Sequence, residues 1–343
     1  AAPAPAAAGT PLCTVSDRRM RELSGLVTVD SGYVAINDSN GDRSAIRVFF
    51  LDDRCRLTKS VGYPTAARDP EDLATAPDGG LWVADIGDNF NAKTHRTTVA
   101  VWRLSPGGST PVIHRLVYPD GHHDAEALLI DGDGLPLLIT KEILGSARIY
   151  KPSRALAAGT AAGVPLVLVG RFTPQRTGTP NPFGATGRLA VTGAATAPDR
   201  RRVLLRTYAD AYEFDVPDGD VVAALTGGTP RVTPLPDEPQ GEAITYTHDA
   251  TGFVTVSDAE GPAPLLRYAP TAAGEEPSDD AADAAATAGA DPAPASSGPA
   301  ERARLSLASG RTVTTLVGAF GVALVLGLML ARGRAGRQPG PRR

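Results

Sequence analysis

The sequence predicts an all-β protein: a five-bladed β-propeller closed by a strand from its own N-terminus, followed by a disordered stalk and one C-terminal transmembrane helix. Three observations lead to this prediction: an internal repeat over roughly residues 10–270, an apolar run at the start that completes the last repeat, and a long uncharged run near the end. Glycine (37 residues) and proline (30 residues) are abundant, which favours short strands joined by tight turns over long helices.

The repeat consists of five segments with one shared pattern. Each has a small or acidic opening, a short apolar strand, a turn rich in Asp and Gly, a second apolar strand and a polar ending. Further strand-like runs follow most segments, such as RVFFLDD and LTKSVGYP after the first. Four short antiparallel strands per unit, at a period of about fifty residues, are typical of a propeller blade. The segments begin at Glu22, Glu71, Glu126, Thr192 and Glu242.

The fifth unit lacks a fourth strand after LLRYAP, and the run LCTVSD around Cys13 supplies one. Closing the ring in this way removes an open sheet edge that would otherwise be prone to aggregation. Cys55 lies at the turn into the outer strand of the first blade, next to the closing strand. We therefore expect a Cys13–Cys55 disulfide in an oxidising compartment. The alternative, a reactive thiol, has no catalytic signature around either cysteine.

The two ends predict export and membrane attachment. Residues 1–9, almost entirely Ala and Pro, have the character of a remnant left after signal-peptide cleavage. Residues 271–310 form an acidic linker rich in Ala and Pro, which we expect to be a disordered stalk. Residues 311–332 are predicted to span the membrane, because no charge occurs from Val313 to Ala331.

The basic tail, residues 333–343, is predicted to be cytoplasmic, which leaves the propeller extracellular. Two alternatives for the apolar run remain open. One is a buried core helix, and the other is a cell-wall sorting signal, although no LPxTG-like tag precedes the run.

The openings of the five segments are the candidate metal site. The first strand of each blade lines the central channel, so these openings converge on the axis. The predicted ligands are Ser24, Glu71, Glu126, Thr192 and Glu242. Like charges held close together raise one another's pKa or recruit a cation. Because every donor is an oxygen, the set favours Ca²⁺ over Mg²⁺ or Zn²⁺. In the alternative reading, these side chains bond to the backbone of neighbouring blades, or pair with Lys141 and Arg206, without a metal.

The endings of the second strands reach the same mouth and supply candidate ligand-binding residues. Lys141 and Arg206 are candidates for holding an anion, since each follows an apolar strand toward the axis. Asp38 and Asp85 are candidates for binding substrate or orienting a water, and Asp258 lies at the corresponding ending of the fifth segment. The alternative for any one of these residues is a charged loop that faces water.

The Ser, Glu, Glu, Thr, Glu series resembles that of the calcium-activated nucleotidases (apyrases), five-bladed propellers with a Ca²⁺ on the axis. ELSGL followed by YVAINDSNG is similar to the apyrase pattern ELSDL…YTVDDRTG. ELSGL and PEDL also resemble the SdiA-regulated family of propellers and, more loosely, the phytase-like esterases. The resemblance covers the propeller but neither the stalk nor the anchor. Two departures are Thr192 in place of a serine and the absence of an arginine from the word at Asn37–Asn40, so the resemblance favours the metal site over nucleotidase activity.

These observations favour a membrane-anchored extracellular module that binds a small molecule or a surface protein, with a mainly structural axial Ca²⁺. The alternative is a calcium-dependent phosphohydrolase or esterase acting at the same mouth, and a third possibility is a scaffold without metal. Nucleic acid is not an expected partner, because the net charge is −4 and no basic field covers the body.

Overall fold

The computed structural model describes residues 8–38, 43–236 and 238–271, all of which belong to one compact unit. The predicted stalk after Thr271, the predicted transmembrane helix and the predicted basic tail lie outside these residues, as does most of the predicted signal-peptide remnant. Within the described ranges, no helix is both long enough and apolar enough to cross a bilayer.

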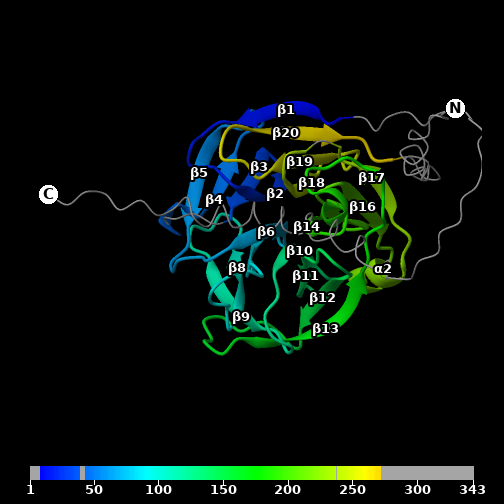
Figure 1. The fold of residues 1–343 in the computed structure, drawn as a ribbon. Helices are drawn as coiled ribbons and strands as arrows, with labels where there is room; N and C mark the ends of the chain where they lie inside the picture. Colours follow the sequence, from blue (N-terminus) through cyan, green and yellow to red (C-terminus); the bar gives the residue numbers. More distant parts are fainter. Residues whose placement is uncertain (1–7, 39–42, 237, 272–343) are drawn as a thin grey trace, which may run out of the picture. The chain divides into compact units, whose positions relative to one another are not determined.

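The described chain has an all-β, propeller-like fold built from four-stranded antiparallel units (Figure 1). The first strand of each unit lies near the centre of the ribbon, and we call these five the inner strands. The inner strands are β2 (Leu23–Val29), β6 (Pro70–Thr75), β10 (Ala125–Ile130), β14 (Val191–Thr196) and β18 (Gly241–Tyr246). Each pairs with the next strand along the chain: β3 (Gly32–Asn37), β7 (Leu81–Asp85), β11 (Pro136–Thr140), β15 (Arg202–Thr207) and β19 (Phe253–Ser257).

Third and fourth strands complete each unit toward the rim. The third strands are β4 (Arg47–Leu51), β8 (Val99–Leu104), β12 (Ala147–Pro152), β16 (Asp210–Asp215) and β20 (Ala263–Tyr268). The fourth strands are β5 (Leu57–Gly62), β9 (Val112–Val117), β13 (Val164–Phe172), β17 (Arg231–Pro234) and β1 (Thr10–Val15). Pairing of β1 with β20, from Thr10 opposite Arg267 to Val15 opposite Ala263, confirms the predicted closing strand.

One join between units was not predicted. β13 runs parallel to β9 for two residue pairs, so two of the units form a single eight-stranded sheet. The few helices are short: η1 (Arg43–Ala45), α1 (Gly184–Gly187) and α2 (Val221–Gly227). The carboxylate of Asp220 caps α2 by accepting a hydrogen bond from the backbone N–H of Ala223.

Apolar side chains on both faces of the sheets hold the units together. Five buried clusters lie between neighbouring units; one packs Leu129 of β10 with Leu205 of β15, and another packs Leu23 of β2 with Val256 of β19. The inner strands contact one another in the order β2, β6, β10, β14, β18 and back to β2. This closed circuit brings the openings of all five inner strands together.

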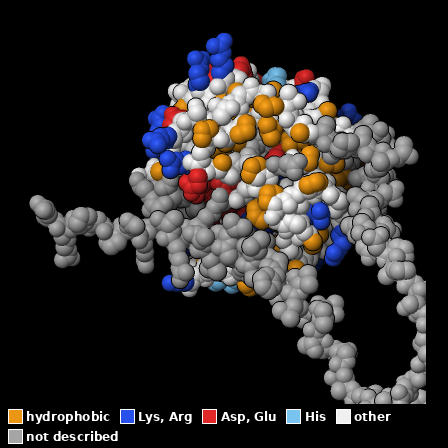
Figure 2. All heavy atoms as spheres, turned by 45° about the horizontal axis from the view of Figure 1, so that its top comes forward, with side chains coloured by type: hydrophobic (Ala, Val, Ile, Leu, Met, Phe, Trp, Pro, Cys, Tyr) orange, Lys and Arg blue, Asp and Glu red, His pale blue; other side chains and the backbone are white. Residues whose placement is uncertain are grey.

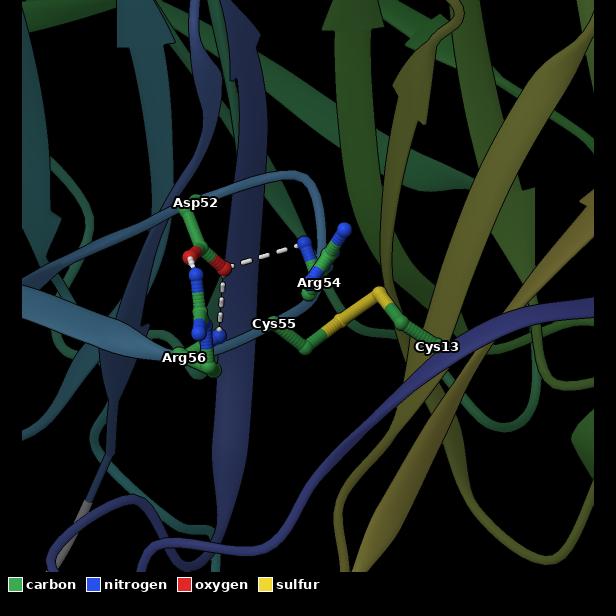
Figure 3. Close-up of a disulfide and its surroundings, with 5 residues drawn as sticks. All are labelled: Cys13, Asp52, Arg54, Cys55 and Arg56. Carbon is green, nitrogen blue, oxygen red and sulfur yellow. Dashed lines mark hydrogen bonds and ion pairs between the residues drawn. A yellow bond between two sulfur atoms is a disulfide. The ribbon is translucent and has the colours of Figure 1, made fainter.

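The seam between the first and last strands carries the predicted disulfide. Cys13 of β1 is bonded to Cys55, and the two Cα atoms are 5.8 Å apart (Figure 3). Cys55 adopts a φ of 60° in the turn before β5. The carboxylate of Asp52 stabilises this turn by accepting hydrogen bonds from the backbone N–H groups of Arg54 and Arg56.

The surface carries no single dominant charge cluster on the face seen in Figure 2. Lysine and arginine side chains occur there at several separate places, with hydrophobic and neutral side chains between them.

Candidate functional site at the centre of the ring

All five predicted metal ligands occupy the same structural position. In each inner strand the pairing register shifts by one residue at the predicted ligand, so that this residue bulges out of the ladder. The bulged residues are Ser24, Glu71, Glu126, Thr192 and Glu242. A β-bulge re-aims a side chain relative to its strand neighbours, and bulges are over-represented beside functional sites. The bulge therefore gives a geometric reason for the repeat pattern.

The three glutamates of this set lie close enough to influence one another electrostatically. Burial, then the charges of Asp69 and Glu126, and further those of Asp38 and Glu242, raise the pKa of Glu71 well above its ordinary value. Each of the three glutamates is 5% exposed, so solvent screens their repulsion poorly. The structure thus places Glu71, Glu126 and Glu242 within electrostatic range of one another. The three are not, however, among the groups of described residues whose ligand atoms all lie within 4.8 Å of one another.

The two hydroxyl residues bond to the neighbouring inner strand. Ser24 Oγ donates a hydrogen bond of 2.8 Å to the carbonyl of Pro70, and Thr192 Oγ1 donates one of 3.0 Å to the carbonyl of Gly241. These bonds match the backbone contacts of the metal-free reading. They are also compatible with metal binding, because a hydroxyl that donates its proton keeps two lone pairs.

Lys141 provides a positive charge inside the cluster. Its ammonium forms an ion pair with Glu126 Oε1 and lies 5.5 Å from the ring centroid of Tyr208. Burial acts to lower the pKa of Lys141, but the charges of Glu126 and its neighbours outweigh this effect and raise the pKa well above its ordinary value. Glu126 Oε2, in contrast, is buried and has no hydrogen-bond partner within the described residues.

A second group of carboxylates, which shares Glu242 with the first, forms a close acidic cluster. Asp38, Glu242 and Asp258 each place an oxygen within 4.8 Å of the other two. Gln240 donates hydrogen bonds to Glu242 Oε1, at 2.9 Å, and to Asp258 Oδ2. Burial, followed by the charges of Glu242 and Asp258, raises the pKa of Asp38 well above its ordinary value.

Backbone hydrogen bonds explain why these groups meet. The N–H groups of Asp38, Lys141 and Asp258, each just after a second strand, donate to carbonyls two residues before a bulge. The acceptors are Glu22, Asp124 and Gln240. Second-strand endings and first-strand openings therefore share one end of the ring, which places Asp38, Lys141 and Asp258 beside the predicted ligands.

The remaining two ligand-binding candidates lie in interior networks. Asp85 accepts hydrogen bonds from the backbone of Arg68 and Asp69 and from Trp102 Nε1, and forms an ion pair of 2.8 Å with Arg96. Arg206 has no exposed surface and donates to Glu238 Oε2 at 3.1 Å and to the carbonyl of Ala243. In this structure, these hydrogen bonds occupy both side chains.

Several residues of the site were missed from the sequence. Asp69 and Gln240 lie two residues before a bulged residue, as Glu22 does relative to Ser24. Comparing this position across the five segments could have identified them. Gly87 leaves room for two carboxylates: a Cβ added there would lie 2.2 Å from Glu71 Oε1 and 2.5 Å from Asp69 Oδ2. A glycine at this position is therefore part of the site.

Asp72 was missed as well. Its side chain connects three of the inner strands. Its fully buried carboxylate accepts backbone hydrogen bonds from Leu73, Leu128 and Ala194, which belong to three different inner strands. Burial raises the pKa of Asp72 well above its ordinary value, against the opposing effect of these hydrogen bonds.

The loop from Thr173 to Gly187 packs against the same end. The ring of Phe183 lies 4.3 Å from that of Tyr208, measured between centroids, and the Tyr208 hydroxyl donates a hydrogen bond of 3.4 Å to Glu242 Oε1. Asp210 anchors the loop by accepting hydrogen bonds from Thr177 and Thr179, both at 2.6 Å.

The residues present suit a hard divalent cation. Carboxylates and hydroxyls are ligands that Ca²⁺ prefers, and a dication would offset the burial and the repulsion that together raise the pKa of Glu71 and Asp38. Glu126 Oε2, buried and without a hydrogen-bond partner among the described residues, provides a donor atom that a cation would satisfy. The donor set therefore fits the predicted metal.

Comparisons with known proteins find distant likenesses to solved structures. A scan against protein-family models finds no match, and a search of curated proteins finds none either. Among solved structures, a glucose dehydrogenase is similar to the chain at 10% identity, covering 77% of this chain and 100% of the other, with a TM-score of 0.42. A gluconolactonase from Xanthomonas campestris is similar at 15% identity, covering 69% and 68%, with a TM-score of 0.37. The structure of a nidogen/laminin complex is similar at 11% identity, covering 69% and 72%, with a TM-score of 0.39. Likenesses with TM-scores below 0.5 bear on neither activity nor ligand.

Proposed function

We propose that the protein is a membrane-anchored, extracellular, five-bladed β-propeller whose axial calcium site organises a ligand-binding or surface-interaction module. The observation that carries the proposal is that Glu71, Glu126 and Glu242 occupy equivalent bulges of different inner strands and lie within electrostatic range of one another. Such a cluster costs free energy when it is empty, because like charges repel and buried carboxylates are poorly solvated. Calcium would remove that cost and tie neighbouring blades together.

The five-blade assignment is supported by the closed circuit of inner-strand contacts and by the pairing of β1 with β20. Attachment to the membrane is supported by the uncharged run from Val313 to Ala331 and the arginines that follow it. An exported location also agrees with the Cys13–Cys55 disulfide, since disulfides persist in oxidising compartments.

A second candidate function, calcium-dependent hydrolysis of a phosphate ester or carboxylic ester, is favoured by Lys141. Its ammonium lies within the carboxylate cluster, where it could help to neutralise an anionic substrate. Calcium would supply further positive charge in such a reaction. Lys141 would hold the anion, while Tyr208, whose hydroxyl reaches Glu242, would orient it.

A calcium titration tests the proposed site. We expect Ca²⁺, added after EDTA, to raise the melting temperature, while Mg²⁺ at the same concentration has a much smaller effect. Glu242→Gln should weaken the calcium affinity read from this titration by about tenfold or more, since a charged ligand is lost. Glu260→Gln is the matched control, because the Glu260 side chain is 66% exposed and its distance from Arg21 is 3.9 Å. A melting temperature indifferent to EDTA and Ca²⁺ would contradict the proposal.

A substrate panel separates the two functions. Phosphate release from nucleotides and phosphate monoesters, and hydrolysis of carboxylic esters, would be measured with Ca²⁺ for the native protein and Glu126→Gln. A calcium response without turnover supports the binding module. Turnover that Glu126→Gln abolishes would replace it with the hydrolase.

A further inference from the structure

A second cluster of potential metal ligands lies apart from the axial carboxylates. Asp88, His95 and His122 each place one ligand atom within 4.8 Å of the other two. None of these residues belongs to the predicted calcium ligands or to the neighbouring cluster of Asp38, Glu242 and Asp258. Asp88 and His95 come from the segment after β7, and His122 from the segment before β10, so residues far apart in sequence build the cluster.

The Asp88–His95 half of the cluster is held in place by a hydrogen-bond network. The Asp88 side chain is 4% exposed, its Oδ2 accepts a bond of 3.0 Å from the backbone N–H of Arg96, and its own N–H donates to Asp124 Oδ1 at 3.1 Å. The Arg96 guanidinium is also buried and bonds to Asp85 and to the carbonyl of Gly87. These bonds fix the chain on both sides of His95.

The two histidine rings face each other. Their centroids are 3.4 Å apart and their planes differ by 4°. The His95 side chain is 28% exposed, while His122 is an exposed residue that follows Gly121, which has a φ of 111°. Because His122 is exposed, its ring has room to turn so that a nitrogen, rather than a ring face, points toward His95 and Asp88.

The distances suit a borderline metal ion. His95 Nδ1 lies 3.3 Å from Asp88 Oδ1. Two ligands of a tetrahedral Zn²⁺, each bonded at about 2.0–2.1 Å, are separated by about 3.3 Å. Two imidazole nitrogens with one carboxylate favour Zn²⁺, Co²⁺, Ni²⁺ or Cu²⁺, whereas Ca²⁺ favours oxygen ligands alone.

We propose that Asp88, His95 and His122 form a transition-metal site of the zinc class, separate from the axial calcium site. Asp88 and His95 form its fixed part, and His122 closes onto the metal. Three protein ligands leave a fourth position on the exposed side, which water or an anionic group of a ligand would occupy. The cluster shares no ligand with the axial site, so this proposal stands or falls independently of calcium.

Cobalt is the probe, because tetrahedral Co²⁺ absorbs visible light and reports its ligands. The full chain, saturated with Ca²⁺, would be titrated with Co²⁺ and then with Zn²⁺ in competition. We expect one visible absorption signal that Zn²⁺ displaces. His95→Ala and His122→Ala should each weaken Co²⁺ binding by at least about tenfold.

Matched variants separate a local site from general effects. His248→Ala removes a histidine that is also exposed, and it should leave Co²⁺ binding unchanged. Glu242→Gln should leave it unchanged as well, because that change lies in the axial cluster. Asp88→Asn keeps an oxygen that can accept from Arg96, so it should weaken Co²⁺ binding without unfolding the protein. The proposal would be overturned by no Co²⁺ signal in the native protein, or by a signal that survives both His95→Ala and His122→Ala in folded protein.

Discussion

Lys141 and Glu126 form an ion pair in which only 6% of each side chain is exposed. Glu126 is the bulged residue of β10, and Lys141 directly follows β11, the strand that pairs with β10. The pair therefore puts one positive charge within electrostatic range of Asp124 and Glu242 as well as Glu126. In the metal-free protein, this charge offsets part of the repulsion between them.

Replacing Lys141 with methionine should have opposite effects on stability and on calcium binding. In EDTA, Glu126 loses its partner, and the free energy of unfolding should fall by about 3–5 kcal/mol, as for other broken buried pairs. Calcium affinity should rise by about tenfold, because a unit charge that repels the dication is gone. Urea unfolding in EDTA and calcium titration measure the two effects. An unchanged calcium affinity in the folded variant would show that Lys141 does not compete with a bound cation.

Gly87→Ala should damage the axial site by steric contact. The added Cβ would lie 2.2 Å from Glu71 Oε1, so that the carboxylate must move. Calcium affinity should fall by about tenfold or more, since ligand positions must be held to about 0.5 Å. Gly145→Ala is the control, because a Cβ there meets no atom within 4 Å. Equal calcium affinities for the two variants, from calorimetric titration, would argue against Glu71 as a ligand.

Arg206→Met should destabilise the fold whether or not calcium is present. Glu238 would be left buried without its cation, at a cost of about 3–5 kcal/mol in the free energy of unfolding. Arg21→Ala, at an exposed pair 3.9 Å long, should change the same quantity by less than about 0.5 kcal/mol. Denaturant unfolding at saturating Ca²⁺ makes the comparison. If Arg206→Met instead leaves stability intact and abolishes binding of an anionic ligand, the ligand-binding role predicted from the sequence is correct.

Removing the Cys13–Cys55 disulfide should loosen the seam of the ring. The bond joins residues separated by 42 positions. Loop-closure entropy alone predicts a loss of about 4 kcal/mol in the free energy of unfolding for the double alanine variant. Unfolding curves with and without a reducing agent test this expectation. The native protein should shift on reduction, and the variant should not. An unshifted native protein would mean that the closing strand is secured by packing alone.

The fold could be predicted from the sequence because the order of apolar runs within each repeated segment gives the order of the strands. Each bulged residue opens an apolar run, and a turn rich in Asp and Gly separates that run from its partner. The closing strand followed from a missing fourth strand in the last unit. No sequence pattern predicts the parallel contact of β13 with β9. This contact depends on the lengths of two outer strands from different units.

The site was only partly accessible. The repeat showed which residues stand at equivalent openings of the five segments, and Glu71, Glu126 and Glu242 were predicted as ligands for that reason. It did not tell where a long side chain ends. Arg206 forms an ion pair with Glu238, a residue outside the repeat pattern, and Asp85 forms one with Arg96. The approach of His95 to His122 depends on two loops, and periodicity carries no information about loops.

A crystal structure of the protein grown with Ca²⁺, with anomalous diffraction measured at a long wavelength, tests the central claim most directly. The account predicts an anomalous peak at the axis, about 2.3–2.6 Å from oxygens of Glu71, Glu126 and Glu242. Well-ordered density with no anomalous peak there, and with these carboxylates bonded to water and Lys141 alone, would contradict it.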